Sequence, residues 1–506
     1  MGKLLRTIII TGAAFVLNYL INLVLTPFIT DTVGTEAYGF VSLAKNCAQY
    51  ATIITVALNS FASRYIALEF HNGNLAQSNV YFSSVFWGDF AIGSIIVAAA
   101  FGFIGFLEYI FVVPEAILTD VKILFIFVFI NFWITTVFTV FSSSAYIKNK
   151  LDISGIFKGL SYVAEAIVLL ALYAFLPEKI FYVGIGLVAA ALVIALSNIY
   201  ISQKYTPDLS INRKWFKKSA VRRLILDGLW SSANSLGDVL NSGLDLAVCN
   251  LLLTPTAMGQ VAIAKTIDNI FHSLYQMVSQ AFQPLFLKSY AVNNKNQLLS
   301  ELKLSMKMSG MLSNIAFAGF FALGMSYYQL WIPNQDIGLI YGLTLVTISA
   351  SIVTGPMTPL YYIYTLTVKK KIPCMVTILG GFFNVAGMFI LIRYTSMGIY
   401  AVVWTTTIVM VTINFVTNPL YMSHVLKIPW KTFYPSLFRN IFSCIILTCV
   451  FSVFGKIYMP HSWMGLIVCA LLYSVAGAFL HFAVVYDNEE KKKLYNALKN
   501  RFMKKK

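Results

Sequence analysis

Two lysines interrupt apolar stretches of the chain at related places. Residues 37–45 read AYGFVSLAK and residues 257–265 read AMGQVAIAK, so five of nine positions are identical at an offset of 220 residues. Each copy ends on a lysine, Lys45 or Lys265. A charge at membrane depth is costly and usually faces a cavity or a partner. The two lysines therefore predict either a polar cavity or internal salt bridges, for instance from Lys265 to Asp268 or Asp245.

Further polar residues accompany the lysines at helical spacing. Asp238, Asn241 and Asp245 are three and four residues apart, so they share one face of a helix. From Lys265 to Gln283 the same spacing continues for about five turns. The stripe predicts a surface that lines water or substrate, with internal salt bridging as the alternative. The residues expected to line a cavity are Asn18, Asn22, Gln49, Tyr50, Asn59, Asn234, Asn241, Asn269, His272, Gln276 and Gln280. Those expected to couple an ion or to pair with the lysines are Asp238, Asp245, Asp268 and Glu165.

The elements that must position these residues are helices that span a membrane. The chain of 506 residues is 58% hydrophobic and 11% charged, whereas a soluble protein is about 25% charged. Its apolar blocks have the length of about 20 residues that a helix needs to cross the hydrocarbon core. We therefore predict an all-α polytopic membrane protein with 14 transmembrane helices. They cover roughly 7–30, 38–63, 81–107, 121–147, 155–176, 180–203, 225–252, 258–284, 307–331, 338–366, 372–393, 398–423, 436–456 and 464–486.

The basic residues predict the orientation of these helices. The chain has 37 lysines and arginines against 20 acidic residues, a net charge of +17. With the N-terminus inside, 31 of the 37 fall on the inner side and four on the outer side, and Lys45 and Lys265 make up the rest. The positive-inside rule thus predicts that both termini are cytoplasmic. Most of the positive charge serves topology, so a nucleic-acid partner is not expected.

Signatures of catalysis are missing from the sequence. It contains no phosphate-binding loop of the form GxxxxGK[ST], no HExxH and no CxxC pair among its six cysteines. We therefore expect a protein that is not an enzyme and that holds no cofactor or metal. A coupling ion, H⁺ or Na⁺, is the exception left open.

The repeat predicts the domain organisation. Six spans separate the two copies, so both have the same orientation, as in parallel-repeat transporters that bind substrate between two halves. We expect two pseudo-symmetric six-helix lobes followed by two further helices. The divisions are an N-lobe at 1–203, a basic cytoplasmic connector at 204–224, a C-lobe at 225–423, helices 13 and 14 within 424–486 and a basic cytoplasmic tail at 487–506.

Two local motifs resemble a known family. The segment PxITxxVGTEAYG at 27–39 and the segment SRYIA at 63–67 are similar to the start of polysaccharide transporters. These are the Wzx-like oligosaccharide-lipid flippases of the multidrug/oligosaccharidyl-lipid/polysaccharide (MOP) superfamily, which also holds multidrug (MATE) exporters and the lipid II flippase. The resemblance extends to the layout of the whole chain and implies a MATE/MOP-like fold.

The resemblance also implies a function. Such a protein moves an undecaprenyl-pyrophosphate-linked oligosaccharide, the repeat unit of O-antigen, capsule or exopolysaccharide, from the cytoplasmic to the outer leaflet of the bacterial inner membrane by alternating access. Lys45, Lys265 and Arg64 match the basic residues that would bind pyrophosphate, and the amides and tyrosine would bind sugar hydroxyls. The implied partners are the lipid-linked oligosaccharide, inner-membrane lipids and a polysaccharide polymerase.

Other functions compete with this one. A MATE-like, cation-coupled multidrug exporter would use the cavity carboxylates, although the two lysines would repel a cationic drug. A lipid II-type flippase shares the same layout. A scaffold or scramblase that transports nothing actively would leave the polar stripes unexplained.

Overall fold

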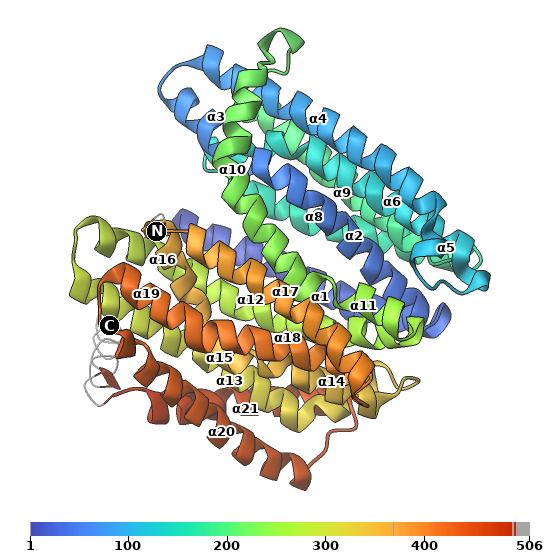
Figure 1. Ribbon diagram of the computed structural model, residues 1–506, viewed down its shortest axis with the longest axis vertical. Coiled ribbons are helices and arrows are strands. Elements are labelled where there is room, and N and C mark those ends of the chain that lie inside the picture. The colour runs from blue at the N-terminus through green and yellow to red at the C-terminus, as the bar shows by residue number, and fades with distance from the viewer. Residues whose placement is uncertain (1, 368, 488–489, 492–506) are drawn as a thin grey trace. The chain divides into compact units, whose positions relative to one another are not determined.

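Helices joined by short turns and loops make up the computed structural model in residues 2–367, 369–487 and 490–491, which are the residues it describes (Figure 1). The chain forms two compact units. The first comprises Met1–Ala262 and Thr377–Ile399, and the second comprises Ile263–Val376 and Tyr400–Lys506. Two helices, α12 and α17, begin in one unit and end in the other.

The first unit contains the N-terminal helices and one late segment. Its elements are α1 (Gly2–Thr32), α2 (Thr35–Asn59), α3 (Ala62–His71), α4 (Leu75–Gly105), α5 (Leu107–Ile110), η1 (Glu115–Ile117), α6 (Leu118–Val137), η2 (Thr139–Phe141), α7 (Ser142–Ile147), α8 (Leu151–Phe175), α9 (Tyr182–Tyr205), η3 (Arg213–Trp215), α10 (Lys218–Asp238), the π-helical η4 (Val239–Gly243), α11 (Asp245–Leu252) and most of α17 (Lys371–Tyr394).

The second unit contains most of α12 and the C-terminal helices. Its elements are α12 (Pro255–Ala291), α13 (Lys295–Trp331), α14 (Ile337–Ser349), α15 (Ser351–Met357), η5 (Thr358–Tyr361), α16 (Tyr362–Leu366), α18 (Tyr400–Thr412), the π-helical η6 (Ile413–Thr417), α19 (Asn418–Leu426), η7 (Trp430–Thr432), α20 (Tyr434–Ile457) and α21 (Trp463–Val485).

Helical segments cover every predicted span, and in the part of the chain that the structure describes eleven of these segments are long and apolar enough to cross a membrane. The protein is therefore an integral membrane protein, and the count of fourteen spans stays a prediction. The three other predicted spans fall on α1, on α10 with α11, and on α12. The last two contain the polar residues at helical spacing, from Asp238 to Asp245 (the acidic stripe) and from Lys265 to Gln283 (the lysine stripe). Polar side chains lower the hydropathy of a span.

The apolar pattern does not reveal where helices change their winding. The predicted span 225–252 is interrupted by η4, and the span 398–423 is interrupted by η6. A π-helical turn holds one extra residue and often marks a functional position in a membrane helix. An asparagine lies in each, Asn241 and Asn414, and both are buried.

The repeat seen in the sequence is also present in the turns before α4 and α13. Asn74 caps α4 by accepting a hydrogen bond from the Gln77 amide at 3.2 Å, and Asn294 caps α13 by accepting one from Gln297 at 3.0 Å. The residue before each asparagine has a positive φ, 78° in one turn and 52° in the other. An offset of 220 residues thus separates two turns with the same backbone and the same cap.

The first turns of α2 and α12 cross each other at equivalent positions of the repeat. Thr256 Oγ1 donates to Glu36 Oε1 at 2.6 Å. A Cβ atom on Gly39 would lie 2.9 Å from the Gly259 nitrogen, and one on Gly259 would overlap the Thr35 carbonyl. Glycine is therefore required at both positions for the helices to approach this closely.

The connector after α9 is fixed along one face of α4. Three polar side chains of α4 at helical spacing bond to its backbone. The bonds are Asn79 Nδ2 to Asp208 O at 2.9 Å, Ser210 N to Asn79 Oδ1 at 2.7 Å, Asn212 N to Ser83 Oγ at 3.2 Å and Lys217 N to Ser84 Oγ at 2.9 Å. The predicted basic connector therefore holds the start of α10 in the first unit.

The last two helices of the second unit are attached to α13 through Lys307. Its side chain is only 4% exposed, and its Nζ lies 2.5 Å from Glu490 Oε2 and 3.8 Å from Asp487 Oδ2. Asp487 also accepts a hydrogen bond from Arg439 of α20 at 2.6 Å. His481 of α21 bonds to the Lys307 carbonyl at 3.1 Å. Beyond Asp487 and residues 490–491, the basic tail predicted for 487–506 lies outside the described residues.

This cluster predicts an acid sensitivity. The Arg439 guanidinium lowers the pKa of the Asp487 carboxyl below its ordinary value of 3.8. A carboxyl with a depressed pKa stabilises the fold above that value, and the stabilisation is lost as pH falls through the folded-state pKa. Because Asp487 is largely exposed, we expect a contribution of about 0.2–1 kcal/mol. Thermal unfolding of the solubilised protein should lose this increment below pH 3.8, and Asp487→Asn should lack it at every pH; an identical acid response in the variant would contradict the assignment.

Candidate functional site

A small polar cavity of about 40 Å³ lies within the first unit, between α1, α2, α8 and α9. Helical spacing explains how each helix contributes one face to it. The lining residues are Asn22, Leu25, Thr26 and Ile29 of α1, Tyr38, Val41, Ser42 and Lys45 of α2, Glu165 and Leu169 of α8, and Val183 of α9. The cavity thus brings together three residues that the sequence singles out separately: Asn22, Lys45 and Glu165.

The cavity places a cation and an acid in the same enclosed space. Lys45 is exposed, Glu165 is half-buried, and the Lys45 ammonium acts electrostatically on the Glu165 carboxyl. Among its described residues the structure records ion pairs with N–O distances of up to 4.0 Å, and the pair of Lys45 and Glu165 is not one of them. Gly186 allows α9 to pack directly against α8 beside Glu165, because a Cβ there would lie 2.9 Å from Leu169 Cγ. Lys45 and Glu165 therefore line the same cavity without a recorded ion pair across it.

Neutral groups complete the lining. Asn22 Nδ2 donates to Asn18 Oδ1 at 2.9 Å and to the Asn18 carbonyl at 2.8 Å, so these two predicted residues act as one unit on α1. Thr26 Oγ1 lies 3.5 Å from the Tyr38 hydroxyl. Thr26, Tyr38 and Ser42 were not predicted, because in an apolar helix a hydroxyl that lines a cavity has the same spacing as one that packs against a neighbour.

Four predicted or neighbouring polar residues support the π-helical segment η4. Tyr50 and Asn46 of α2 both donate to the Gly243 carbonyl, Asn46 at 3.2 Å. Asn241 Nδ2 donates to the Thr377 carbonyl of α17 at 2.6 Å. Asn384 of α17 donates to the Asn241 carbonyl at 2.7 Å. Within the first unit, Tyr50, Asn46 and Asn384 therefore hold backbone carbonyls of η4, and the Asn241 side chain ties η4 to the backbone of α17.

This support predicts unequal costs of substitution. Asn384 is fully buried, and Asn384→Leu would leave the Asn241 carbonyl without its donor, at a cost of about 1–3 kcal/mol. Tyr50→Phe should cost less, about 0.5–1.5 kcal/mol, because Asn46 still donates to Gly243. Thermal unfolding in detergent measures both. An equal or reversed order would contradict the structural role.

Other predicted residues lie elsewhere in the first unit. Asn59 donates to Asp89 of α4 at 2.9 Å, and Asn234 donates to Asp238 one turn further along α10 at 3.0 Å. Gln49 is exposed on α2, Asp245 is buried at the start of α11, and Arg64 is exposed on α3, beyond the break that ends α2. Arg64 is not among the residues that line the cavity.

The lysine stripe of the repeat lies on α12, within the second unit. Its members range from half-buried to exposed, and the His272 ring lies 5.3 Å from the ring of the buried Tyr275. The predicted residues on this helix are Lys265, Asp268, Asn269, His272, Gln276 and Gln280.

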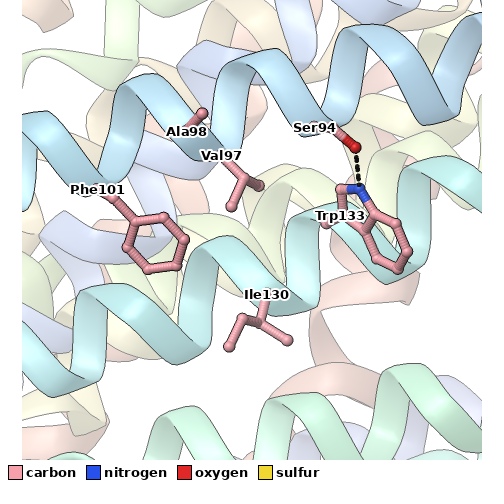
Figure 2. A pocket seen from close by; sticks show the side chains of 6 residues that line it. All are labelled: Ser94, Val97, Ala98, Phe101, Ile130 and Trp133. Carbon is pink, nitrogen blue, oxygen red and sulfur yellow. Dashed lines mark hydrogen bonds between the residues drawn. The ribbon is translucent and has the colours of Figure 1, made fainter.

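A second, larger hollow of about 300 Å³ lies between α4 and α6 (Figure 2). Its lining residues are Ser94, Val97, Ala98, Phe101, Ile130 and Trp133. The Trp133 indole donates to Ser94 Oγ at 3.1 Å, which satisfies the polar groups of the wall. The hollow contains no charged residue, so its chemistry suits a hydrocarbon chain and not a charged substrate.

Comparison with known proteins gives a family and a fold. The family described as "Polysaccharide biosynthesis protein" matches residues 4–290. The chain is 26% identical over 478 residues to the "Uncharacterized membrane protein EpsK" of Bacillus subtilis, with 94% of both chains covered.

Two solved structures have a similar fold. One is a multidrug resistance MATE transporter of the MOP superfamily in an inward-facing conformation, with a TM-score of 0.65, 15% identity and 81% of this chain and 96% of the other covered. The second is the lipid II flippase MurJ in an inward closed conformation, with a TM-score of 0.65, 13% identity and 94% and 99% covered. The MATE/MOP-like fold expected from the sequence is thus confirmed.

Proposed function

Because the chain belongs to the family of polysaccharide biosynthesis proteins, we propose that it is a flippase for a lipid-linked oligosaccharide. The substrate would be an oligosaccharide joined through pyrophosphate to undecaprenol, carried from the cytoplasmic to the outer leaflet of the bacterial inner membrane by alternating access. One observation carries the proposal: Lys45 reaches a polar cavity inside a membrane-embedded bundle. An ammonium binds phosphate oxygens through strong charge-assisted hydrogen bonds.

The basic residues have distinct roles in this proposal. Arg64 lies 19 residues after Lys45, on α3 beyond the break that ends α2, so in this proposal it meets the pyrophosphate near the cytoplasmic end. Lys45 binds the pyrophosphate in the first unit, and Lys265 is the basic residue at the equivalent position of the repeat, on α12. The hydroxyl and amide groups of the lining bind water or the first sugar.

The other polar residues of the sequence divide into two groups. The α12 stripe from Asn269 to Gln280 offers amides and an imidazole to sugar hydroxyls. Tyr50 and Asn241 have a structural role, because they donate hydrogen bonds to backbone carbonyls of η4 and α17. Asp238, Asp245 and Asp268 balance the lysines or bind a coupling ion, H⁺ or Na⁺.

Two other functions remain as alternatives with the same fold. The MATE relationship favours a cation-coupled drug exporter, and the exposed Asp238 on α10 is the carboxylate it would use. The MurJ relationship favours a lipid II-type flippase, whose substrate has the same pyrophosphate and a different glycan. The cation in the cavity argues against the exporter, because it would repel a cationic drug.

Deletion of the gene tests the proposal. The lipid-linked oligosaccharide should accumulate in the cytoplasmic leaflet and the corresponding surface polysaccharide should disappear, with drug susceptibility unchanged. Accessibility of the glycan to an impermeant reagent, before and after the membrane is opened, measures the leaflet distribution. Loss of drug resistance with normal surface polysaccharide would favour the exporter. A block in peptidoglycan synthesis would favour the lipid II-type flippase.

A further inference from the structure

Glu165 is the one acidic residue in the lining of the Lys45 cavity. The helices packed around it contribute few other titratable groups. Lys45 and Tyr38 face the cavity from α2, while α1 and α9 contribute neutral residues to its lining. Tyr162, one turn earlier on α8, lies within electrostatic reach of Glu165. Lys45 is thus the positive charge in the lining that balances this carboxylate.

The proposed substrate changes that balance. A pyrophosphate diester bears negative charge on both phosphates, and it would approach the same ammonium that the carboxylate faces. Two anionic groups that compete for one cation cannot both stay ionised without a cost when one of them, the half-buried Glu165 carboxylate, is partly withdrawn from water. The group that can adjust is the carboxyl, because protonation removes its charge and leaves a neutral acid that donates a hydrogen bond.

We propose that Glu165 takes up a proton when a pyrophosphate-linked lipid binds at Lys45, and releases it when the lipid leaves. The proton comes from water and binds a carboxylate oxygen, and no covalent bond of the substrate changes. The proposal rests on the proposed function. In the empty cavity the lysine and the carboxylate sum to zero charge, so the unloaded protein changes conformation without exposing a net charge to the membrane. When the lipid is bound, the exposed Lys45 ammonium is paired with the pyrophosphate and Glu165 is neutral.

Proton counting on the full-length protein in lipid nanodiscs tests this linkage, with farnesyl diphosphate as the probe. Binding heats measured at one pH in buffers of different ionisation enthalpy give the number of protons taken up per bound probe. The wild type should take up more protons than Glu165→Gln, by up to one. Its affinity should also fall more steeply with rising pH than that of Glu165→Gln, by up to about tenfold per pH unit. The ionisation of the probe is common to both proteins and cancels in the difference.

Controls separate this linkage from general effects of substitution. Glu108→Gln alters an exposed carboxyl that pairs with Lys122 outside the cavity, and it should behave as the wild type. Glu165→Asp keeps a titrating group and should keep the proton uptake, which distinguishes the linkage from a change in folding.

The outcomes distinguish the two proposals. Binding that needs Lys45, with equal proton counts in the wild type and Glu165→Gln, would overturn the proton linkage and leave the flippase proposal standing. The same equality together with a Na⁺ dependence that Glu165→Gln removes would overturn it in favour of Na⁺. Absence of Lys45-dependent binding would overturn the proposed function itself.

Discussion

Lys45→Gln should abolish most of the transport while leaving the protein in the membrane. A hydrogen bond to a charged group contributes about 1.5–3 kcal/mol, so losing the ammonium should weaken substrate binding by about 10- to 100-fold. Glutamine keeps a polar side chain of similar length, so the cavity is not left empty. The measurement is surface polysaccharide in a deletion strain that carries the variant, together with the leaflet distribution of the lipid-linked oligosaccharide.

Two matched variants make this result specific. Lys45→Arg keeps the positive charge and the ability to bind phosphate, so it should retain much more transport than Lys45→Gln. Lys456→Gln removes an exposed lysine at the end of α20 and should have no effect. Normal surface polysaccharide in Lys45→Gln, at wild-type protein levels, would remove Lys45 from the proposed binding site.

A crosslink between Glu36→Cys and Thr256→Cys should stop transport reversibly. The two side chains meet where the first turns of α2 and α12 cross, and Gly39 and Gly259 let the helices touch there. In the predicted lobes these residues belong to opposite halves of the repeat, and alternating access requires the halves to rock against each other. A short thiol-reactive crosslinker should hold the turns together, and a reducing agent should restore transport.

A second cysteine pair provides the control for the crosslink. Glu108 and Lys122 form an ion pair of 2.7 Å within the first unit, so joining Glu108→Cys to Lys122→Cys should leave transport intact. Residual transport in the test pair should match its uncrosslinked fraction. Full transport by completely crosslinked protein would show that these turns stay together throughout the cycle.

The sequence predicts the helices well because a membrane span needs a long apolar block, and such blocks are visible without knowing what surrounds them. It does not predict η4 or η6, since a π-helical turn depends on side chains from other helices, such as Asn384, that bond to the carbonyls it leaves. The charged members of the cavity were predictable because an ionisable group stands out in an apolar segment. Their meeting was not, because the sequence of α8 does not show which neighbouring helix Glu165 faces.

The noncontiguous makeup of the first unit has a consequence for biosynthesis. Residues 377–399 belong to that unit, and there α17 bonds to the η4 backbone through Asn384. Chains emerge from the ribosome N-terminus first. For the time needed to translate more than a hundred further residues, the Asn241 carbonyl of η4 lacks its donor, Asn384, inside the bilayer. Ribosome-bound chains that end before residue 377 should therefore remain sensitive to membrane proteases and depend on insertion chaperones, and chains that end after residue 399 should not.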